Sequence, residues 1–475
     1  MTDTDTYTGS GAAPSGAATR IPGPKGLPLL GSMFELQQDS LGAFLRARRD
    51  HGDVVRVSAG PPGLRTVLHG VFSAEGVQQV LATESANFRK DNPFYEEVRA
   101  AFGNGLLTSQ DADYLRQRRL VQPLFTKRRV DGYADAIAQE AEAVVERWGE
   151  RTTVDLVGEM SRLALRTVAR ILFGADVEAA VEVIHRSFPV INSYALSRAY
   201  APVNVPREWP TPGNRRAMAA IAEVYAVCDR IIAERRAAPE GPVGDDLLTL
   251  LAQAGSEEDG SLDATEIRDQ VLVFLLAGHE TTATSMAFTL HLLSRHPEEQ
   301  ARARQEVDEV LGDRAPTAAD LERLPYLTQV LKEGMRLYPA APVVGRRAGA
   351  DTEIGGYRIP AGSDVVVAPW VTHRNPDLWE DPERFDPERF TPERVAERHR
   401  YAWFPFGGGP RACIGQHFSM LESVLALATL LRGYELTAVD DAEVPVAAGI
   451  TLQAKGPARV RLRSRRKPSP GSDAA

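Results

Sequence analysis

Cysteine is scarce in this sequence: Cys228 and Cys413 are the only two among 475 residues. Two thiols cannot make the disulfide framework of a small secreted protein, and so low a count is typical of a reducing compartment. Cys228 falls in a run with helical periodicity, where we interpret it as a small buried apolar side chain. Cys413 follows three glycines and needs a separate explanation.

Long apolar runs and an excess of basic residues are also missing. No stretch reaches 18 consecutive apolar residues, so we expect no transmembrane anchor. Residues 1–20 have neither the basic start nor the apolar stretch of a signal peptide, and we expect them to form a disordered leader on a cytoplasmic protein. The net charge of −9 argues against nucleic-acid binding, because that requires a basic face.

The apolar periodicity predicts a mainly α protein. Helical spacing extends over residues 130–148, 157–173, 215–236 and 264–294, and the last of these is long enough to cross the whole molecule. A further helix is expected at residues 415–431.

Strands are expected near both ends of the core. Residues 54–58 and 66–69 flank a Gly-Pro-Pro-Gly turn and predict a hairpin, and residues 351–370 have the apolar runs and turn residues of further strands. The tail, residues 464–475, is polar and expected to be disordered. We therefore expect one domain at residues 21–463.

The segment around Cys413 has the composition of a ligand loop. Glycine allows a backbone to approach a flat ligand closely, and the unpaired N–H groups at the start of the following helix favour an anion such as a thiolate. Arg411 carries a planar cation suited to a carboxylate. Taken alone, the same residues also fit a glycine-rich loop with an inert thiol. A zinc site with His417 is disfavoured because no second Cys/His pair lies at a suitable spacing.

The pattern Phe406-x-x-Gly409-x-Arg411-x-Cys413-x-Gly415 resembles the heme-ligand signature of the cytochrome P450 family at every fixed position. The resemblance covers nearly the whole chain. It implies the family's fold: a large helical domain with a small β-rich domain, and heme b (iron protoporphyrin IX) between a long central helix and the cysteine loop. It further implies that Cys413 is the axial iron ligand and that Phe406 and Arg411 lie against the cofactor. A thiolate ligand promotes O–O cleavage.

Glu333 and Arg336 stand three residues apart, on one face of an expected helix. This spacing is common and carries no information alone. Its position before Arg389 and the cysteine loop resembles the family's Glu-Arg-Arg network, which implies that these three residues hold the loop in place. Since a buried charge network is destabilised strongly when one partner is lost, we expect Glu333→Ala to prevent heme incorporation.

Ala277-Gly278-His279-Glu280-Thr281-Thr282 lies inside the long helix. The Thr281 hydroxyl is placed to bond the carbonyl of Ala277 and open a local groove, although a simple packing notch has the same composition. The segment resembles the family's oxygen-binding motif, which implies that Glu280 and Thr281 relay protons to dioxygen. No role is expected for His279.

Three further residues are candidates for the heme propionates by resemblance. Tyr114 stands where the family commonly has Trp or His, and Arg118 follows it by four residues. Tyrosine departs from the family pattern but still offers one hydrogen bond. Arg346 occupies a third position where the family often has a propionate partner, and Arg347 is the alternative.

The resemblance implies a monooxygenase, an oxidoreductase that inserts one atom of O2 into an apolar small molecule. Candidate pocket segments are residues 92–102, 273–277, 341–344 and 449–451, whose Phe94, Phe102 and Phe274 favour a terpene-, steroid- or fatty-type substrate.

About sixty residues follow Cys413, which leaves no room for a flavin domain, so we expect electrons from a separate ferredoxin or flavodoxin. We expect this donor to dock on a basic cluster of Arg116, Arg119, Lys127, Arg128 and Arg129. Two alternatives remain: a heme-thiolate peroxygenase or isomerase, and a non-catalytic heme-binding sensor.

Overall fold

The structure is a computed structural model, and it describes residues 20–173, 178–199, 201, 204–237 and 247–465. Helices dominate it, as the periodicity predicts. The longer ones are α1 (Met33–His51), α3 (Pro93–Phe102), α4 (Asp111–Val121), α6 (Ala134–Trp148), α7 (Leu156–Phe173), α8 (Glu178–Ala199), α9 (Pro212–Ala237), α11 (Ala264–Arg295), α12 (Pro297–Leu311), α14 (Pro325–Leu337) and α17 (Gln416–Gly433).

Short helices fill the connections between these long ones. They are α2 (Ala74–Gln78), α5 (Lys127–Asp131), α10 (Leu247–Gln253), α13 (Asp320–Arg323), α15 (Pro369–Thr372) and α16 (Pro392–Glu397), with single turns η1 (Gln79–Thr83), η2 (Gln122–Phe125), η3 (Pro387–Phe390), η4 (Arg400–Ala402) and η5 (Gly409–Arg411). The helix expected at residues 130–148 is therefore two helices, because the chain turns at Gly132 and Tyr133 between α5 and α6. Glycine has a low helix propensity, which explains the break.

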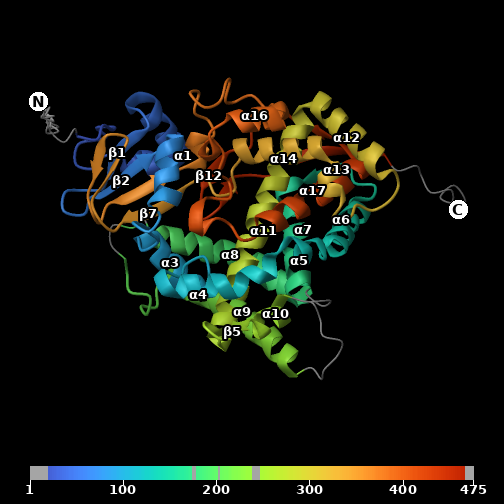
Figure 1. Cartoon of the computed structure of the whole chain (residues 1–475), viewed down its shortest axis with the longest axis horizontal. Helices are drawn as coiled ribbons and strands as arrows, with labels where there is room; N and C mark the ends of the chain where they lie inside the picture. The colour runs from blue at the N-terminus through green and yellow to red at the C-terminus, as the bar shows by residue number, and fades with distance from the viewer. Residues whose placement is uncertain (1–19, 174–177, 200, 202–203, 238–246, 466–475) are drawn as a thin grey trace, which may run out of the picture.

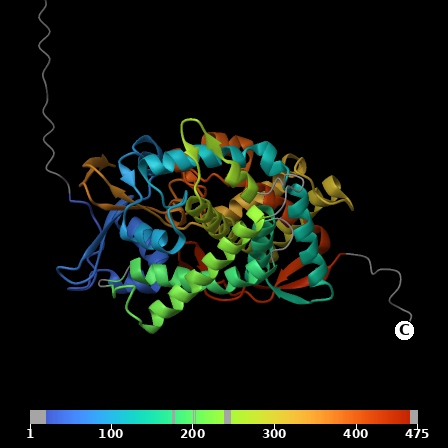
Figure 2. The same cartoon turned by 90° about the horizontal axis from the view of Figure 1, so that it is seen from below.

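The main sheet has the order β1-β2-β10-β7-β3 and lies at one side of the molecule, away from α12, α13 and α17 (Figure 1). The view turned by 90° keeps the blue and orange strands of this sheet at the same side (Figure 2). β1 and β2 form the expected antiparallel hairpin, β10 pairs parallel to β2, and β10 and β3 both pair antiparallel to β7. The strands are β1 (Val54–Ala59), β2 (Thr66–Val71), β3 (Phe88–Arg89), β7 (Val344–Ala348) and β10 (Asp364–Val367).

The remaining strands form smaller sheets. β11 (Tyr434–Ala438), β14 (Arg459–Ser464) and β4 (Thr153–Asp155) make a three-stranded sheet, and three hairpins join β5 (Gly255–Ser256) to β6 (Gly260–Ser261), β8 (Thr352–Ile354) to β9 (Tyr357–Ile359) and β12 (Val446–Ala448) to β13 (Leu452–Ala454). The β8–β9 hairpin was expected, whereas β7 and the strands after α17 were not predicted.

Helix α11 is the central element of the fold. It begins at a capping box, in which the Asp263 carboxylate accepts the N–H groups of Thr265 and Glu266 while the Glu266 carboxylate accepts the N–H of Asp263. It is the one described helix long and apolar enough to cross a membrane, but 72% of its most apolar window is buried inside the protein. It packs against α7, α14 and α17, so its apolar character belongs to the core.

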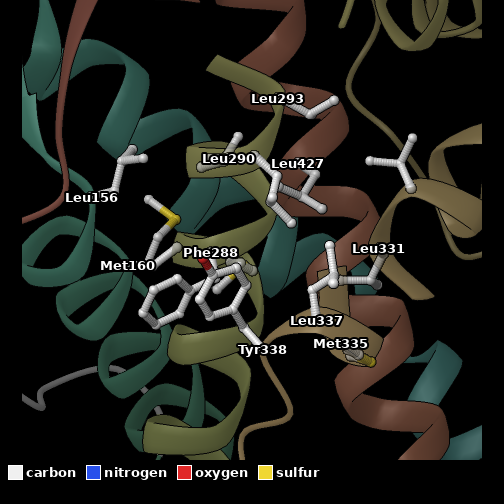
Figure 3. Packing of buried hydrophobic residues seen from close by; sticks show 14 of the residues in the cluster. Leu156, Met160, Phe288, Leu290, Leu293, Leu331, Met335, Leu337, Tyr338 and Leu427 are labelled. Carbon is white, nitrogen blue, oxygen red and sulfur yellow. The ribbon is translucent and has the colours of Figure 1, made fainter. Parts of the chain in front are cut away.

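The core between α11, α14 and α17 is closely packed (Figure 3). Leu290 and Leu293 of α11 lie beside Leu427 of α17, and all three are fully buried. The rings of Phe288 and Tyr338 stack with centroids 4.2 Å apart and an interplanar angle of 7°. This packing fixes the end of α14 against the long helix.

The ends of the chain lie mostly outside the described residues. This holds for the expected leader, residues 1–20, except Arg20, and for the expected tail, residues 464–475, except Ser464 and Arg465. Ser464 is the last residue of β14 and pairs with Tyr434, and Arg465 forms an ion pair with Asp308. These two residues are therefore part of the folded domain.

Candidate active site

A cavity of about 340 Å³ lies between the middle of α11 and the loop that carries Cys413. Its wall is mainly apolar and draws on helices α3, α4, α7 and α11, the loop before β7 and the cysteine loop. Two of the polar groups that reach it are hydroxyls of α11, Thr281 and Ser285. The two segments that the sequence assigned to the site, residues 277–282 and 404–415, therefore face each other across one space.

The cysteine loop is held by its own backbone. The Cys413 N–H donates to the Phe406 carbonyl at 2.9 Å, and the Gly407 N–H donates to the Phe404 carbonyl at 2.9 Å. This arrangement leaves the Cys413 side chain accessible from the cavity although protein surrounds it. Both Phe406 and Cys413 line the cavity.

The three glycines of this loop have different roles. Gly407 has φ +69° and lines the cavity, and a Cβ there would meet nothing within 4 Å. A Cβ on Gly408 would lie 2.4 Å from the Tyr401 ring, and one on Gly409, with φ +61°, would lie 2.1 Å from the Leu81 carbonyl oxygen. Only Gly407 therefore borders the space for a flat ligand, and the other two let the loop pack against protein.

The sequence predicted that the start of the following helix favours a thiolate at Cys413, and the surroundings of this thiol differ from that expectation. Burial raises the pKa of the Cys413 thiol, while the Gly415 N–H and the cations Arg118 and Lys90 lower it without reversing the effect. The helix start therefore does not by itself hold this sulfur as a thiolate. A metal ion bonded to the sulfur would deprotonate it outright.

Four cations converge on the cavity near Cys413: Lys90, Arg118, Arg346 and Arg411. Within the described ranges none of them has a carboxylate partner; instead each donates to neutral oxygens such as the carbonyls of Leu107, Ala412, Gly345 and Ser109. Burial lowers the pKa of Lys90 well below its usual value, and the neighbouring Arg346 and Arg411 lower it further. An anionic ligand bound in the cavity would supply the counter-charge that these four side chains lack.

The structure separates the candidates that the sequence left open here. Arg346 is buried and lines the cavity, whereas Arg347 pairs with Asp364 at 3.0 Å. The Tyr114 hydroxyl donates to the Pro410 carbonyl at 2.7 Å, and its ring lies 3.5 Å from the Arg411 guanidinium carbon. Tyr114 therefore supports the cysteine loop with its single hydroxyl proton and Arg411 with its ring.

These residues fit a heme. The cavity offers a sulfur ligand, a glycine that leaves room for a flat ring, and four cations for two propionates, and heme can be ligated by a cysteine thiolate. The zinc alternative does not fit, because His417 bonds the Asp131 carboxylate at 2.8 Å and the described residues contain no group of three or more potential ligands. Cys228 is buried with a pKa of about 12 because of burial, which matches its reading as an inert apolar residue.

Helix α11 has the expected hydrogen bond at Thr281. The Thr281 hydroxyl donates to the Ala277 carbonyl at 2.6 Å, and both residues line the cavity with Gly278. A Cβ on Gly278 would lie 3.0 Å from Val168, so glycine also lets α7 approach at this point. The hydrogen bond and the packing notch that the sequence allowed are therefore both present.

Glu280 is the neighbour of Thr281 on α11, but its side chain does not line the cavity. The cavity lining includes Thr281 and not Glu280. Its carboxylate accepts one hydrogen bond from the Asn192 amide at 2.8 Å and one from the Thr451 hydroxyl at 2.9 Å. Burial raises the pKa of Glu280 to about 7, against the lowering effect of those two hydrogen bonds.

The Glu-Arg-Arg network forms behind the cysteine loop. Glu333 and Arg336 are fully buried and joined by two hydrogen bonds of 2.7 and 2.8 Å, and Arg389 lies 3.4 Å from the Glu333 carboxylate. Arg336 also donates to the His373 carbonyl at 2.8 Å, and the His373 ring accepts the Phe404 N–H at 3.0 Å. The pair thus connects through His373 to the start of the cysteine loop.

The substrate side of the cavity agrees with the sequence except at one residue. Each of the four expected segments contributes, including Phe94, Phe274, Val343 and Ile450. Phe102 does not line the cavity, because it packs into the core against Phe188 with ring centroids 5.6 Å apart.

Sequence reasoning missed Lys90, Asn192 and the part of the wall formed by α7. Lys90 gave no local signal, because a lone lysine is usually a solvated surface charge.

The expected basic docking cluster is also smaller than predicted. Arg116 pairs with Glu266, Arg119 with Asp259, and Lys127 with Asp131. In the part of the chain that the structure describes, only Arg128 and Arg129 of that cluster are exposed without an ion pair.

Comparisons with known proteins agree with this geometry. The sequence model of the family described as Cytochrome P450 matches residues 21–458. Cyclooctatin synthase of Streptomyces melanosporofaciens is 39% identical, with 92% of this chain and 94% of that protein covered. Cyclooctat-9-en-7-ol 5-monooxygenase of the same organism is 37% identical (90% and 92%), and pentalenene oxygenase of Streptomyces avermitilis is 34% identical (93% and 96%). The crystal structure of the cytochrome P450DA heme domain superposes with a TM-score of 0.84 at 30% identity, covering 94% of this chain and 98% of that one.

Proposed function

Because the chain belongs to the cytochrome P450 family and is a monooxygenase, we propose that it inserts one atom of O2 into a terpene-type hydrocarbon, with electrons from a separate ferredoxin or flavodoxin. The observation that carries the proposal is the Cys413 thiol, which opens into an apolar cavity opposite the Thr281 hydroxyl. The protein acts in the cytoplasm, in keeping with its two free thiols.

The residues near Cys413 would hold heme b. Cys413 would ligate the iron, Arg118, Arg346, Arg411 and Lys90 would neutralise the propionates, and Phe406 would lie against the ring. When bound, the heme would supply dioxygen activation promoted by the thiolate ligand. The protein's own part is to exclude water with an apolar wall, orient the substrate and deliver protons through Glu280 and Thr281.

The cavity wall favours a terpene over the other apolar classes that fit the composition. Phe94, Val98, Val273 and Ile450 present only hydrocarbon to a substrate, and the four cations gather near Cys413, where the propionates would use them. A fatty acid would need a cation of its own for its carboxylate. Two relatives are named for pentalenene and cyclooctat-9-en-7-ol, and neither name contains an acid group.

Two measurements test the proposal in sequence. The purified protein should contain heme, and its reduced carbonyl adduct should show the red-shifted absorption that a thiolate ligand imposes, whereas Cys413→Ser should lose that absorption. Cyclic terpene hydrocarbons should then shift the heme spin state at lower concentration than fatty acids do. A fatty acid that binds more tightly than every terpene would refute the substrate class.

Oxygen use separates monooxygenation from the two alternatives. With a ferredoxin system, substrate should increase O2 consumption and give a product that carries one added oxygen atom. Thr281→Ala should divert O2 to peroxide. Turnover with peroxide that is indifferent to Thr281→Ala would indicate a peroxygenase or isomerase, and tight binding without O2 consumption would indicate a sensor.

A further inference from the structure

Glu280 joins three elements that are distant in sequence. It lies on α11, Asn192 lies on α8, and Thr451 lies in the turn between β12 and β13. Each of the two partners bonds a different oxygen of the Glu280 carboxylate, so both oxygens are directed away from the cavity. The Glu280 carboxylate therefore lies behind the cavity wall, in contact with α8 and with the β12–β13 turn.

The β12–β13 turn continues this connection to the surface. The Thr451 side chain is buried, and its hydroxyl donates to Glu280 while it accepts the Gln453 amide at 2.8 Å. Gln453 is exposed to solvent. Leu452 anchors the turn by donating its N–H to the Ala340 carbonyl at 2.8 Å, and Ile450 of the same turn lines the cavity.

We propose that the β12–β13 turn is the proton entrance of the site, where Thr451 passes protons from water at Gln453 to the Glu280 carboxylate. In each transfer the Thr451 O–H bond breaks as a proton moves to Glu280, and the Thr451 oxygen takes a new proton from a hydronium ion that replaces the Gln453 amide and leaves as water. No electrons move, and the net change is one proton carried inward. This inference rests on the proposed function in one respect, which is that the proton reaching Glu280 is then used at Thr281.

Asn192 has a different role from Thr451. Its amide nitrogen donates a hydrogen bond but cannot take up and release a proton in the same way, because an amide is not a proton relay near neutral pH. Asn192 is therefore a positioning residue that holds the carboxylate toward Thr451. It also ties α8 to α11, so the geometry of the carboxylate depends on the position of α8.

The titration of Glu280 supports a relay. Its pKa of about 7 means that the proton-loaded and proton-free forms are both populated near neutral pH. Burial is the cause, and Thr451 and Asn192 oppose it by hydrogen bonding; no charged group among the described residues contributes. The neighbouring His279 is buried with a pKa of about 4 and stays neutral.

The test compares Thr451→Val, which keeps the shape and removes the hydroxyl, with Thr451→Ser, which keeps the hydroxyl. The readout is the infrared carbonyl band of protonated Glu280 in the resting heme protein, assigned by its loss in Glu280→Gln, and its exchange rate after transfer to D2O. We expect Thr451→Val to slow exchange at least about 100-fold, the low end of the effect of losing one proton-transfer group, and Thr451→Ser to restore it.

Asn192→Leu is the matched control for a disturbed carboxylate. It should shift the band by removing one hydrogen bond, and it should slow exchange much less than Thr451→Val does. Unchanged exchange in Thr451→Val, or equal slowing in Asn192→Leu, would overturn the assignment of the entrance. Because the exchange rate is measured without turnover, its outcome is separate from a failure to find an oxidised substrate.

If the protein oxidises a terpene, the same variants give a second readout. Thr451→Val should release more peroxide per O2 consumed than the wild type, with the substrate's spin-state titration unchanged, because the hydroxyl does not line the substrate cavity. A change in substrate affinity with unchanged peroxide release would count against the entrance.

Discussion

At the scale of single residues, some hydrogen bonds of this site join neighbours in the sequence and others join residues that are far apart in it. Thr281 and Ala277 are four residues apart, so their hydrogen bond follows from helix geometry and could be predicted from the sequence. The partners of Glu280 could not, because Asn192 is 88 residues away and Thr451 is 171 residues away. Nothing in the local sequence of either residue indicates that it bonds a carboxylate.

The raised pKa of Glu280 predicts how stability depends on pH. A glutamate ordinarily titrates at 4.5, and here the folded value is about 7. Between these values the folded state binds more protons than the unfolded state, so stability falls as pH rises from about 4.5 to about 7. A shift of this size corresponds to roughly 3 kcal/mol above pH 7.

Glu280→Gln removes this dependence, because glutamine has no proton to lose. We expect the thermal midpoint of Glu280→Gln to rise relative to that of the wild type as pH increases from 4.5 to 8. Most of this relative increase should fall between pH 4.5 and 7. Thermal melts across this range check the prediction. A constant difference between the two proteins would mean that Glu280 titrates at its ordinary pKa.

At the scale of elements, the sequence located the helices well and the strands less well. The ends of α11 and α7 agree with the predicted helices to within one residue, because α7 has a long amphipathic pattern and α11 a long apolar one that begins at a capping box. β7 was missed because its sequence, Val-Gly-Arg-Arg-Ala, contains two arginines and a glycine and therefore lacks a strand pattern. Its arginines have separate functions, since Arg347 meets Asp364 of β10 while Arg346 faces the cavity.

Helix α14 carries the element-scale prediction, Glu333→Ala. The change leaves Arg336 buried without its partner, a loss of about 3–5 kcal/mol for a buried pair. Since Arg336 also holds the His373 carbonyl and His373 holds Phe404, we expect the cysteine loop to shift and heme incorporation to fail. The ratio of heme absorption to protein absorption after purification measures this.

Glu299 of α12 provides the matched control. It precedes Arg302 by the same three residues, but Arg302 pairs with Glu388 instead. Glu299→Ala should therefore keep its heme. If Glu333→Ala purified with full heme content as well, the network would be dispensable for the loop, and its agreement with the family pattern would carry no structural meaning.

At the scale of the whole molecule, the net charge of −9 would repel an acidic electron donor. Such a donor needs a local basic surface, and the structure reduces the predicted five-residue cluster to Arg128 and Arg129. Both lie on α5, which the Asp131–His417 contact ties to the helix that follows Cys413. Both arginines are therefore close in the fold to the helix that begins after Cys413, which makes α5 our candidate for the docking site of the electron donor.

Charge reversal at both positions tests this placement. We expect Arg128→Glu with Arg129→Glu to slow reduction by ferredoxin at least about tenfold at low ionic strength and to flatten its salt dependence, because steering by a charged surface is screened by salt. Arg215 and Arg216 of α9 are the matched control, since they are also adjacent, exposed and without an ion pair in the described ranges. Reversing the α9 pair changes the net charge equally, so an equal loss in both variants would show that overall charge governs the encounter and that α5 is not the docking site.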